Sequence, residues 1–307
     1  MKRSKAPGLR IHRPMSSTEA ALVIDTPSFH YVVQKLRSFF LERGFLECHT
    51  QNRLSILAAC EDPSTITTFQ YVGQPYPLPQ TGQMWLEYEL LKRPQFPGYF
   101  CVSTSYRQEP NPIPGRHDLI FPMFEFELKG GMEELERMER DLLEYLGYGA
   151  PSTFPSGNYT DIAEQYGVLE ISHAEEQRLA AEKGAVFFLK NFPEYTSPFW
   201  NMQRNAAAKT ANKIDVILSG METIGSAERS TDVHDMLERF THISNGMYAK
   251  TLFNQFGKER VMAEMNEFLG NTFMVRSGGG IGLTRLISSM KKEGLIPPSV
   301  QNPVDKV

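Results

Sequence analysis

Two stretches of the chain place apolar residues at the spacing of an amphipathic helix. The first runs from Thr26 toward Gly44 and repeats Phe29, Val32, Val33, Leu36, Phe39 and Phe40. Thr26 and Pro27 suit an N-cap and a first helical turn, and Gly44 suits a helix end. The second repeats Met132, Leu135, Met138, Leu142 and Leu146. Its other positions are mostly charged, so we predict a helix with one buried and one solvated face.

Shorter stretches have the pattern of strands. Residues 99–106 are aromatic and β-branched, residues 123–128 alternate apolar and polar side chains, and residues 214–218 end at a Ser-Gly turn. Residues 277–290 run from a glycine cluster into an apolar helix. Strands and helices are mixed without a regular βαβ alternation, which favours an α+β domain around an antiparallel sheet.

Composition narrows the classes of protein. The 307 residues, 41% of them hydrophobic, suffice for one large domain or two small ones. A net charge of −4 implies no large nucleic-acid footprint, although a local basic patch stays open. No apolar run approaches a membrane span and no signal peptide opens the chain, so we expect a cytoplasmic protein without membrane contact. Residues 1–24 are basic; we expect a flexible leader or arm, with a partner-binding or nucleic-acid-binding tail as the alternative.

The first group of candidate functional residues begins at Arg107. In a strand, Arg107 and Glu109 point to one face, where an arginine can bind phosphate or carboxylate and a glutamate can accept from an amino group. A proline-rich loop follows and ends in Arg116 and His117. The next strand carries Phe121, Glu125 and Glu127 on one face. A surface ladder of salt bridges would produce the same pattern.

A second group flanks the Ser-Gly turn. Asp215 and Glu222 can approach each other across a hairpin, and two carboxylates beside phosphate oxygens suit Mg²⁺. Arg229 lies seven residues after Glu222. An exposed acidic turn is the other interpretation.

The third group is the run SGGGIGLTR, residues 277–285. Its glycines permit close approach to a ligand, and a following helix N-terminus favours anions. It is neither a P-loop nor a complete dinucleotide-binding fingerprint.

In order and spacing, these groups resemble the motifs of class II aminoacyl-tRNA synthetases. Residues 106–125 are similar to motif 2, and GGGIGLTRL from Gly278 is similar to motif 3. GMETIGSAER (220–229), TGQMWLE (81–87) and SPFWNM (197–202) resemble segments of the aspartyl/asparaginyl subgroup. The resemblance covers roughly residues 28–290. It implies a class II synthetase-type antiparallel sheet flanked by helices, a single catalytic domain over 25–307, ATP and Mg²⁺ as cofactors, and a homodimer.

The resemblance also implies roles for individual residues. The residues expected to bind ATP are Arg107, Glu109, Arg116, His117, Phe121, Glu222, Gly282 and Arg285. The residues expected to bind the substrate are Glu61, Gln83, Glu125, Arg229 and Gly278. Arg229 would pair with the side-chain carboxylate or carbonyl of the amino acid. Asp215 and Glu222 would hold the metal. Arg107, Arg229 and Arg285 are the expected catalytic residues, and Glu125 or Glu87 could accept a proton.

Departures from the family pattern shape the expected function. The anticodon-binding domain is not seen, Leu86 replaces a lysine of aspartyl-tRNA synthetases, and Thr284 replaces the acid before the motif 3 arginine. The sequence of motif 3 is more similar to that of ammonia-dependent asparagine synthetase, a tRNA-independent member of this fold. Gln51 replaces the motif 1 proline. We expect activation of aspartate as an adenylate and transfer to ammonia, with tRNA not expected as a partner. The alternatives are another amine, carrier or tRNA acceptor, and a non-catalytic sensor of amino acid or nucleotide.

Overall fold

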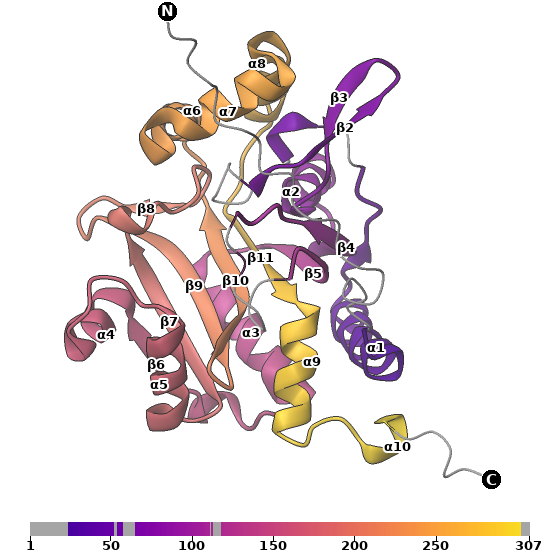
Figure 1. The fold of residues 1–307 in the computed structure, drawn as a ribbon, viewed down its shortest axis with the longest axis vertical. Helices are drawn as coiled ribbons and strands as arrows, with labels where there is room; N and C mark the ends of the chain where they lie inside the picture. The colour runs from indigo at the N-terminus through magenta and orange to yellow at the C-terminus, as the bar shows by residue number, and fades with distance from the viewer. Residues whose placement is uncertain (1–23, 52–53, 58–64, 111, 113–117, 302–307) are drawn as a thin grey trace, which may run out of the picture.

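The computed structural model describes residues 24–51, 54–57, 65–110, 112 and 118–301. Their centre is a nine-stranded sheet of order β1-β4-β5-β11-β10-β9-β7-β6, in which β8 pairs with β9 (Figure 1). The strands are β1 (Leu46–Glu47), β4 (Gly98–Tyr106), β5 (Ile120–Lys129), β6 (Ser156–Asn158), β7 (Val186–Pro193), β8 (Arg204–Asn205), β9 (Thr210–Leu218), β10 (Met221–Arg229) and β11 (Arg276–Gly282). Only β1–β4 and β6–β7 are parallel pairs among the described strands of this sheet. The prediction of an α+β fold around a largely antiparallel sheet is confirmed.

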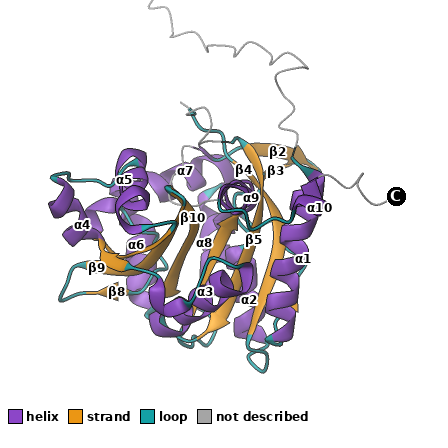
Figure 2. Cartoon of the chain, turned by 90° about the horizontal axis from the view of Figure 1, so that it is seen from below, coloured by secondary structure: helices purple, strands orange, loops and turns teal. Residues whose placement is uncertain are grey.

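Helices flank the sheet, as the turned view in Figure 2 shows. They are α1 (Thr26–Glu42), α2 (Gln83–Lys92), α3 (Met132–Leu146), α4 (Tyr159–Tyr166), α5 (His173–Lys183), α6 (Val233–His242), α7 (Met247–Phe256), α8 (Lys258–Leu269), α9 (Leu283–Lys292) and α10 (Pro298–Gln301). A separate hairpin of β2 (Thr68–Tyr71) and β3 (Gln74–Pro77) projects from the body near α2 (Figure 1). No described helix combines the length and the apolar character that crossing a membrane requires.

The two faces of the sheet differ in chemistry because side chains alternate along each strand. On β5, Phe124 and Phe126 are fully buried in the main apolar core, which residues of α1, α3 and α9 complete. The intervening Glu125 and Glu127 point to the opposite face, where α2 packs on β4 and β5. The polar face is therefore the one on which a functional site can form.

Local predictions can be compared with these elements. Helix α3 spans the predicted residues and ends at Gly147, whose φ of 102° suits glycine. Helix α1 also forms, but its N-cap is Asp25 and not Thr26. The Asp25 carboxylate accepts from the backbone N–H of Ser28 at 3.3 Å, which satisfies an otherwise unpaired donor of the first turn. Residues 1–23, which make up nearly all of the predicted leader, lie outside the described residues.

Candidate active site

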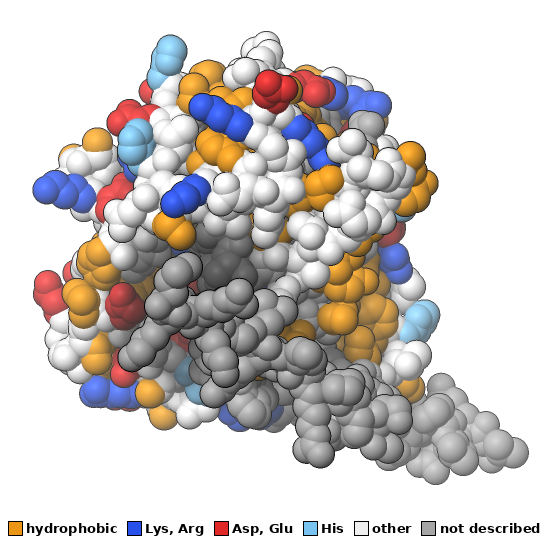
Figure 3. All heavy atoms as spheres, turned by 45° about the horizontal axis from the view of Figure 1, so that its top comes forward, with side chains coloured by type: hydrophobic (Ala, Val, Ile, Leu, Met, Phe, Trp, Pro, Cys, Tyr) orange, Lys and Arg blue, Asp and Glu red, His pale blue; other side chains and the backbone are white. Residues whose placement is uncertain are grey.

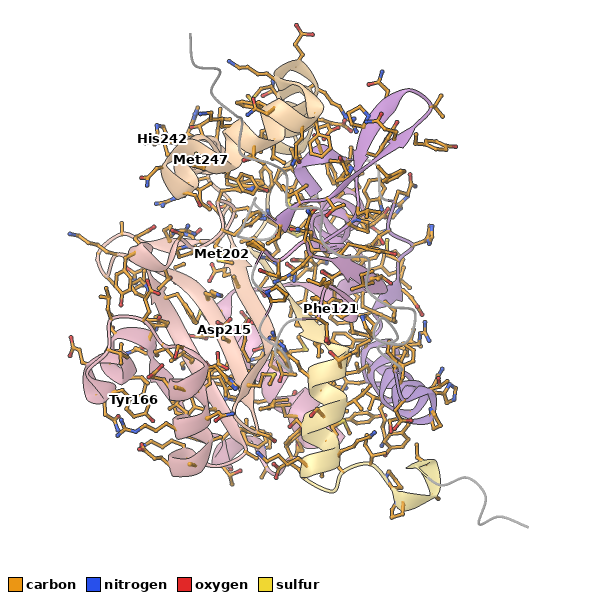
Figure 4. The ribbon with its side chains drawn as sticks, in the orientation of Figure 1. Phe121, Tyr166, Met202, Asp215, His242 and Met247 are labelled. Carbon is orange, nitrogen blue, oxygen red and sulfur yellow. The ribbon has the colours of Figure 1, made fainter. Side chains whose placement is uncertain are left out.

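A cavity of about 280 Å³ opens on the polar face of the sheet, beside the start of α2. Its lining residues are Thr81, Gln83, Arg107, Glu109, Asp118, Phe121, Met123, Glu125, Phe199, Met202, Lys213, Glu222, Thr223, Gly225, Ser226, Arg229, Gly280, Gly282, Thr284 and Arg285. Figure 4 labels two of them, Phe121 and Met202, and also Asp215, which lies beside the cavity on β9. Four basic and four acidic side chains share the lining, so the cavity suits a ligand that carries both signs of charge.

One end of the cavity carries an arginine and an aromatic ring. Strand β4 ends at Tyr106, so Arg107 and Glu109 lie just beyond it and not within a strand as predicted. The backbone N–H of Arg107 donates to the carbonyl of Leu119 at 2.8 Å, which ties this segment to the approach of β5. The guanidinium of Arg107 lies 5.6 Å from the centre of the Phe121 ring. A planar cation beside an aromatic face is suited to a nucleotide, whose base stacks and whose phosphates pair with arginine.

The two predicted metal-binding carboxylates meet over Gly225. A β-bulge interrupts the β9–β10 pairing between Glu222 and Ile224, and Asp215 lies opposite Gly225. A Cβ added to Gly225 would be 3.2 Å from Oε1 of Glu222 and 3.6 Å from Oδ1 of Asp215. The extra residue of the bulge re-aims Glu222, and the missing side chain at Gly225 leaves room between the carboxylates.

This pair fits Mg²⁺ held jointly by protein and nucleotide. Within the described part of the chain, no three His, Cys, Asp or Glu side chains could hold a metal by themselves. Mg²⁺ commonly takes only one or two carboxylates and completes its shell with phosphate oxygens and water. Arg285 reinforces the arrangement, because its Nη1 donates to the carbonyl of Glu222 at 2.7 Å. Asp215 and Glu222 are therefore the residues that would hold the metal.

The other end of the cavity is formed by the buried Arg229. Its Nε and Nη2 donate to Oε1 of Glu127 at 3.0 and 2.6 Å, and Nη2 also reaches Oε1 of Gln83 at 3.3 Å. Arg276 pairs with Glu87 at 2.6 Å, and Glu87 lies 3.8 Å from Arg229. Two cations and two anions thus balance in a buried network. Among the described contacts Nη1 of Arg229 takes no hydrogen-bond partner, which leaves its two N–H groups for a ligand.

Burial perturbs this network electrostatically. Removal from water raises the pKa of Glu127; the charge of Arg229 opposes that rise and the charge of Glu87 adds to it. The same carboxylates raise the pKa of Arg229 against the effect of its own burial. Arginine therefore stays charged at this end of the cavity, and its orientation depends on Glu127.

The glycine run proves to be a strand that makes room for this network. A Cβ on Gly278 would lie 2.2 Å from Cδ of Glu127, so only glycine lets that carboxylate reach Arg229. A Cβ on Gly280 would lie 2.8 Å from Cε of Met123 and 3.5 Å from Nε2 of Gln83. Gly280 therefore belongs to the cavity floor. Gly278, predicted as a substrate contact, is outside the lining and acts through Glu127.

Glu125 has a different environment from the other predicted substrate residues. It lines the cavity, but its oxygens already accept from the N–H of Gly82 at 2.8 Å and from the hydroxyls of Ser103 and Thr81. Gly82 is the N-cap of α2 and has no side chain to offer, so Glu125 supplies the anion at this helix start. Burial raises the pKa of Glu125, while these hydrogen bonds oppose the rise. Its evident effect is to position Gln83 at the first turn of α2.

Most of the predicted site residues come together. The cavity is lined by Gln83, Arg107, Glu109, Phe121, Glu125, Glu222, Arg229, Gly282 and Arg285. Glu61, Arg116 and His117 lie outside the described residues. Glu87, named as a possible proton acceptor, is buried outside the lining and binds Asn201 at 2.7 Å in addition to Arg276.

Sequence reasoning missed Lys213 and Asp118. Lys213 lies two residues before Asp215 on β9 and thus shares its face. The strand alternation in the sequence could have indicated this. Oδ2 of Asp118 accepts from the hydroxyl of Thr284 at 3.3 Å, so a carboxylate still stands beside position 284. Leu86 is fully buried in an apolar cluster and lies outside the cavity lining.

The sequence is similar to a known protein family and to several of its characterised members. The family described as tRNA synthetases class II (D, K and N) matches residues 21–298. Aspartate–tRNA(Asp) ligase of Thermoplasma acidophilum is 22% identical over 281 residues, which are 82% of this chain and 61% of that protein. Aspartate–tRNA(Asp/Asn) ligase of Archaeoglobus fulgidus is 25% identical over 235 residues, 68% of this chain and 53% of that protein. The chain thus spans between half and about three fifths of the length of these relatives.

Solved structures agree on the fold. Asparaginyl-tRNA synthetase of Pyrococcus horikoshii, complexed with asparaginyl-adenylate, aligns with a TM-score of 0.71 at 19% identity, covering 87% of this chain and 65% of that one. Asparaginyl-tRNA synthetase of Entamoeba histolytica with the same adenylate aligns at 0.69 and 18% identity, covering 88% and 64%. The expected class II synthetase-type sheet is confirmed. With the family match extending over residues 21–298, the chain belongs to the class II tRNA synthetases of the aspartate, lysine and asparagine type.

Proposed function

We propose that this chain activates aspartate with ATP as an acyl-adenylate and transfers the acyl group to ammonia, forming asparagine. The observation that carries the proposal is a single cavity that joins Arg107 and Phe121 at one end to the buried Arg229 at the other. The first pair suits a nucleotide, and Arg229 suits the carboxylate or carbonyl of an amino acid. A carboxylate held between these ends would lie beside the α-phosphate of ATP.

Activation requires attack of a carboxylate oxygen on the α-phosphorus. A new P–O bond forms, the bond to the bridging oxygen breaks, and pyrophosphate leaves with that electron pair. Arg107 is placed to offset the charge that grows on the α-phosphate in the transition state. Mg²⁺ held by Asp215 and Glu222 would neutralise phosphate charge when bound. Fixing the two reactants in one cavity supplies proximity, which can lower a barrier by up to roughly 10 kcal/mol.

Transfer requires a nucleophile that reaches the acyl carbon. The nitrogen of ammonia forms the C–N bond, AMP leaves with the electrons of the broken C–O bond, and the nitrogen loses a proton. No protein nucleophile is needed. The carboxylates that line the cavity are Glu109, Asp118, Glu125 and Glu222. Glu125 already accepts three hydrogen bonds, so it would have to exchange a partner before taking a proton.

A second candidate acceptor is tRNA, and the relatives favour it. The curated relatives named above are aspartate–tRNA ligases, and the aligned structures are asparaginyl-tRNA synthetases. On the face drawn in Figure 3, the described lysine and arginine side chains are interspersed with acidic, histidine and hydrophobic ones. That face has the mixed charge of an ordinary protein surface and not the basic stripe typical of nucleic-acid binding. We keep ammonia as the leading acceptor because the motif 3 sequence resembles that of ammonia-dependent asparagine synthetase, and tRNA as the second.

We also propose a homodimer, with the β2–β3 hairpin at or near its interface. Phe69, Tyr71 and Val72 on this hairpin are 37%, 62% and 81% exposed. Large apolar side chains exposed together on a projecting hairpin are typical of a surface that another chain covers. Sedimentation equilibrium of the protein and of a Tyr71→Lys variant would test this, and a monomeric native protein would contradict it.

The decisive experiment supplies ATP, Mg²⁺ and each amino acid, with ammonium, with tRNA or with neither. Aspartate-dependent exchange of pyrophosphate into ATP would support adenylate formation. Ammonium-dependent release of asparagine, AMP and pyrophosphate would support the leading acceptor, and labelled aminoacyl-tRNA would support the second. ATP binding by calorimetry without exchange for any amino acid would instead indicate a non-catalytic sensor.

A further inference from the structure

One wall of the cavity is formed by residues 198–202, called here the wall segment. It belongs to no helix and, apart from a single bridge at Met202, to no strand. All five residues are buried, and Phe199 and Met202 line the cavity. A buried segment of this kind carries backbone carbonyls that no regular ladder satisfies, and an unpaired buried carbonyl is costly. The wall segment therefore depends on donors from elsewhere in the chain.

Arg204 supplies these donors. Its Nη1 donates to the carbonyls of Phe199 at 3.1 Å and Met202 at 2.8 Å, and its Nη2 donates to those of Pro198 at 2.7 Å and Phe199 at 3.1 Å. Nε donates to Oε1 of Glu194 at 3.1 Å. The side chain of Arg204 is only 7% exposed. A planar guanidinium with five N–H groups can bind three carbonyls at once, whereas a lysine donates from a single centre.

The body of the protein also holds Arg204 firmly in place. Its backbone belongs to β8, where it pairs with Ala211 of β9. Its partner Glu194 also accepts from Nη1 of Arg239 on α6 at 3.3 Å. The guanidinium is therefore a fixed point to which the wall segment is attached.

The wall segment lies directly beside Arg229. Met202 and Arg229 face each other in an antiparallel bridge, so their side chains stand next to each other on the cavity face. The backbone N–H of Gln203 donates to the carbonyl of Glu228 at 2.8 Å and continues this contact. A displacement of the wall segment would therefore move the immediate neighbour of Arg229.

A second contact joins the wall segment to the buried network of Arg229. Nδ2 of Asn201 donates to Oε1 of Glu87 at 2.7 Å, and the same carboxylate oxygen lies 3.8 Å from Nε of Arg229. The carbonyl of Asn201 accepts from the backbone N–H of Ser230 at 2.7 Å. The wall segment thus supports both the apolar wall and one anion of the network.

We propose that Arg204 is a positioning residue for the amino-acid end of the cavity. By binding three carbonyls of the wall segment it fixes Phe199 and Met202 against Arg229, and it acts without contact to the amino acid, because it lies outside the cavity lining. The inference rests on the proposed adenylate-forming function and adds to it a residue behind the wall. ATP binding should be spared, because Arg107 and Phe121 belong to the β4–β5 side of the cavity.

The test compares the native chain with Arg204→Met, Arg204→Lys and the matched control Arg140→Met. Arg140 on α3 also binds backbone carbonyls, those of Pro151 and Phe154, both at 2.9 Å, and it pairs with Glu136 at 2.7 Å. It lies on the face of the sheet opposite the cavity. Circular dichroism and thermal melts check that each variant is folded.

Kinetics and binding are measured with aspartate and with asparagine. We expect Arg204→Met to lower kcat/KM of pyrophosphate exchange for the activated amino acid by roughly 10- to 100-fold, because a small misplacement of a binding group is enough to cost that much. The Kd of a non-hydrolysable ATP analogue in calorimetry should stay within about 3-fold. Arg204→Lys should give an intermediate loss. Arg140→Met should lower the melting temperature but leave kcat/KM within about 3-fold.

A spectroscopic readout follows the wall segment without any substrate. Trp200 lies within it and is fully buried, and Trp85 is the other tryptophan of the chain. In a Trp85→Phe background, Arg204→Met should shift the fluorescence of Trp200 to longer wavelength, because a loosened segment admits water. Arg140→Met in the same background should not shift it.

Unchanged kcat/KM in Arg204→Met, or equal weakening of ATP and amino acid, would overturn the inference. Results on the native chain separate this from the proposed function. Native exchange with either amino acid that Arg204→Met retains in full would refute the role of Arg204 alone, and native exchange with neither would refute the proposed function and the inference with it. If Arg204→Met does not fold, Arg204→Lys and Arg140→Lys decide the question in the same assays.

Discussion

Glu139 allows a test of the packed sheet that does not depend on the assigned function. It lies on α3 and is fully buried against the side of the sheet opposite the cavity. Burial raises the pKa of its carboxyl to about 8. The Ser226 hydroxyl opposes this rise, Glu136 and Asp215 add to it, and Arg140 opposes it. At neutral pH the folded protein therefore keeps a proton that the unfolded chain has lost.

The direction of the pH effect follows from the two pKa values. Below the ordinary value of 4.5 both states are protonated, and Glu139 costs no stability. Between pH 4.5 and about 8 the unfolded state ionises first, so the free energy of unfolding falls as the pH rises, and it levels off above that range. One pKa unit corresponds to about 1.4 kcal/mol, so a rise from 4.5 to about 8 gives a full cost on the order of 5 kcal/mol.

Glu139→Gln keeps the shape of the side chain and removes its titration. In urea unfolding with EDTA present, we expect little difference from the native protein at pH 4.5 and a gain of about 2 to 5 kcal/mol at pH 8.5. All other titrating groups are common to both proteins, so they cancel in the difference. Glu144→Gln, at an exposed position of the same helix, should change stability by less than about 0.5 kcal/mol at either pH. A difference for Glu139→Gln that does not vary with pH would refute the reasoning.

Three further predictions concern the cavity. Gly225→Ala should raise the Mg²⁺ concentration needed for half-maximal pyrophosphate exchange by about 10-fold, because the added methyl group would lie 3.2 Å from Glu222 Oε1. The control Gly270→Ala has a similar clearance of 3.3 Å at a position outside the cavity lining, and it should leave this Mg²⁺ concentration unchanged. Arg107→Ala should reduce exchange by roughly 100-fold or more while the protein still folds, and retained exchange would contradict its contact with the α-phosphate. Gly278→Ala should abolish amino-acid binding but not ATP binding in calorimetry, because its Cβ would occupy the position of the Glu127 carboxylate. Equal loss of both ligands would instead indicate general damage to the sheet.

Pattern reasoning was sufficient where one strand or helix decides the outcome. The alternation along β5 correctly placed Phe124 and Phe126 in the core and Glu125 and Glu127 on the opposite face, because that alternation is a property of the extended backbone. The apolar repeat over residues 132–146 likewise predicted a helix, because the 3.6-residue period is a property of the helical backbone. The motif order likewise identified the family, since spacing along the chain is a property of the sequence alone.

Contacts between distant segments could not be predicted in this way. Glu125 lines the cavity, but the pattern did not indicate that it also accepts from the N–H of Gly82 at the start of α2, where glycine offers no capping side chain. Lys213 shares a face with Asp215 by parity, but only the β9–β10–β11–β5 pairing places it in the same row as Glu127.

Local periodicity thus assigns each side chain to a face, whereas the charge of the cavity depends on which strands are neighbours. Arg229 and Glu127 are 102 positions apart, and their salt bridge exists because β11 lies between their strands and has glycine at position 278, which leaves room for the Glu127 carboxylate. The bulge between Glu222 and Ile224 likewise decides that two carboxylates converge over Gly225. Residue types along the chain specify the available chemistry, and the register of the packed strands specifies which groups can act together.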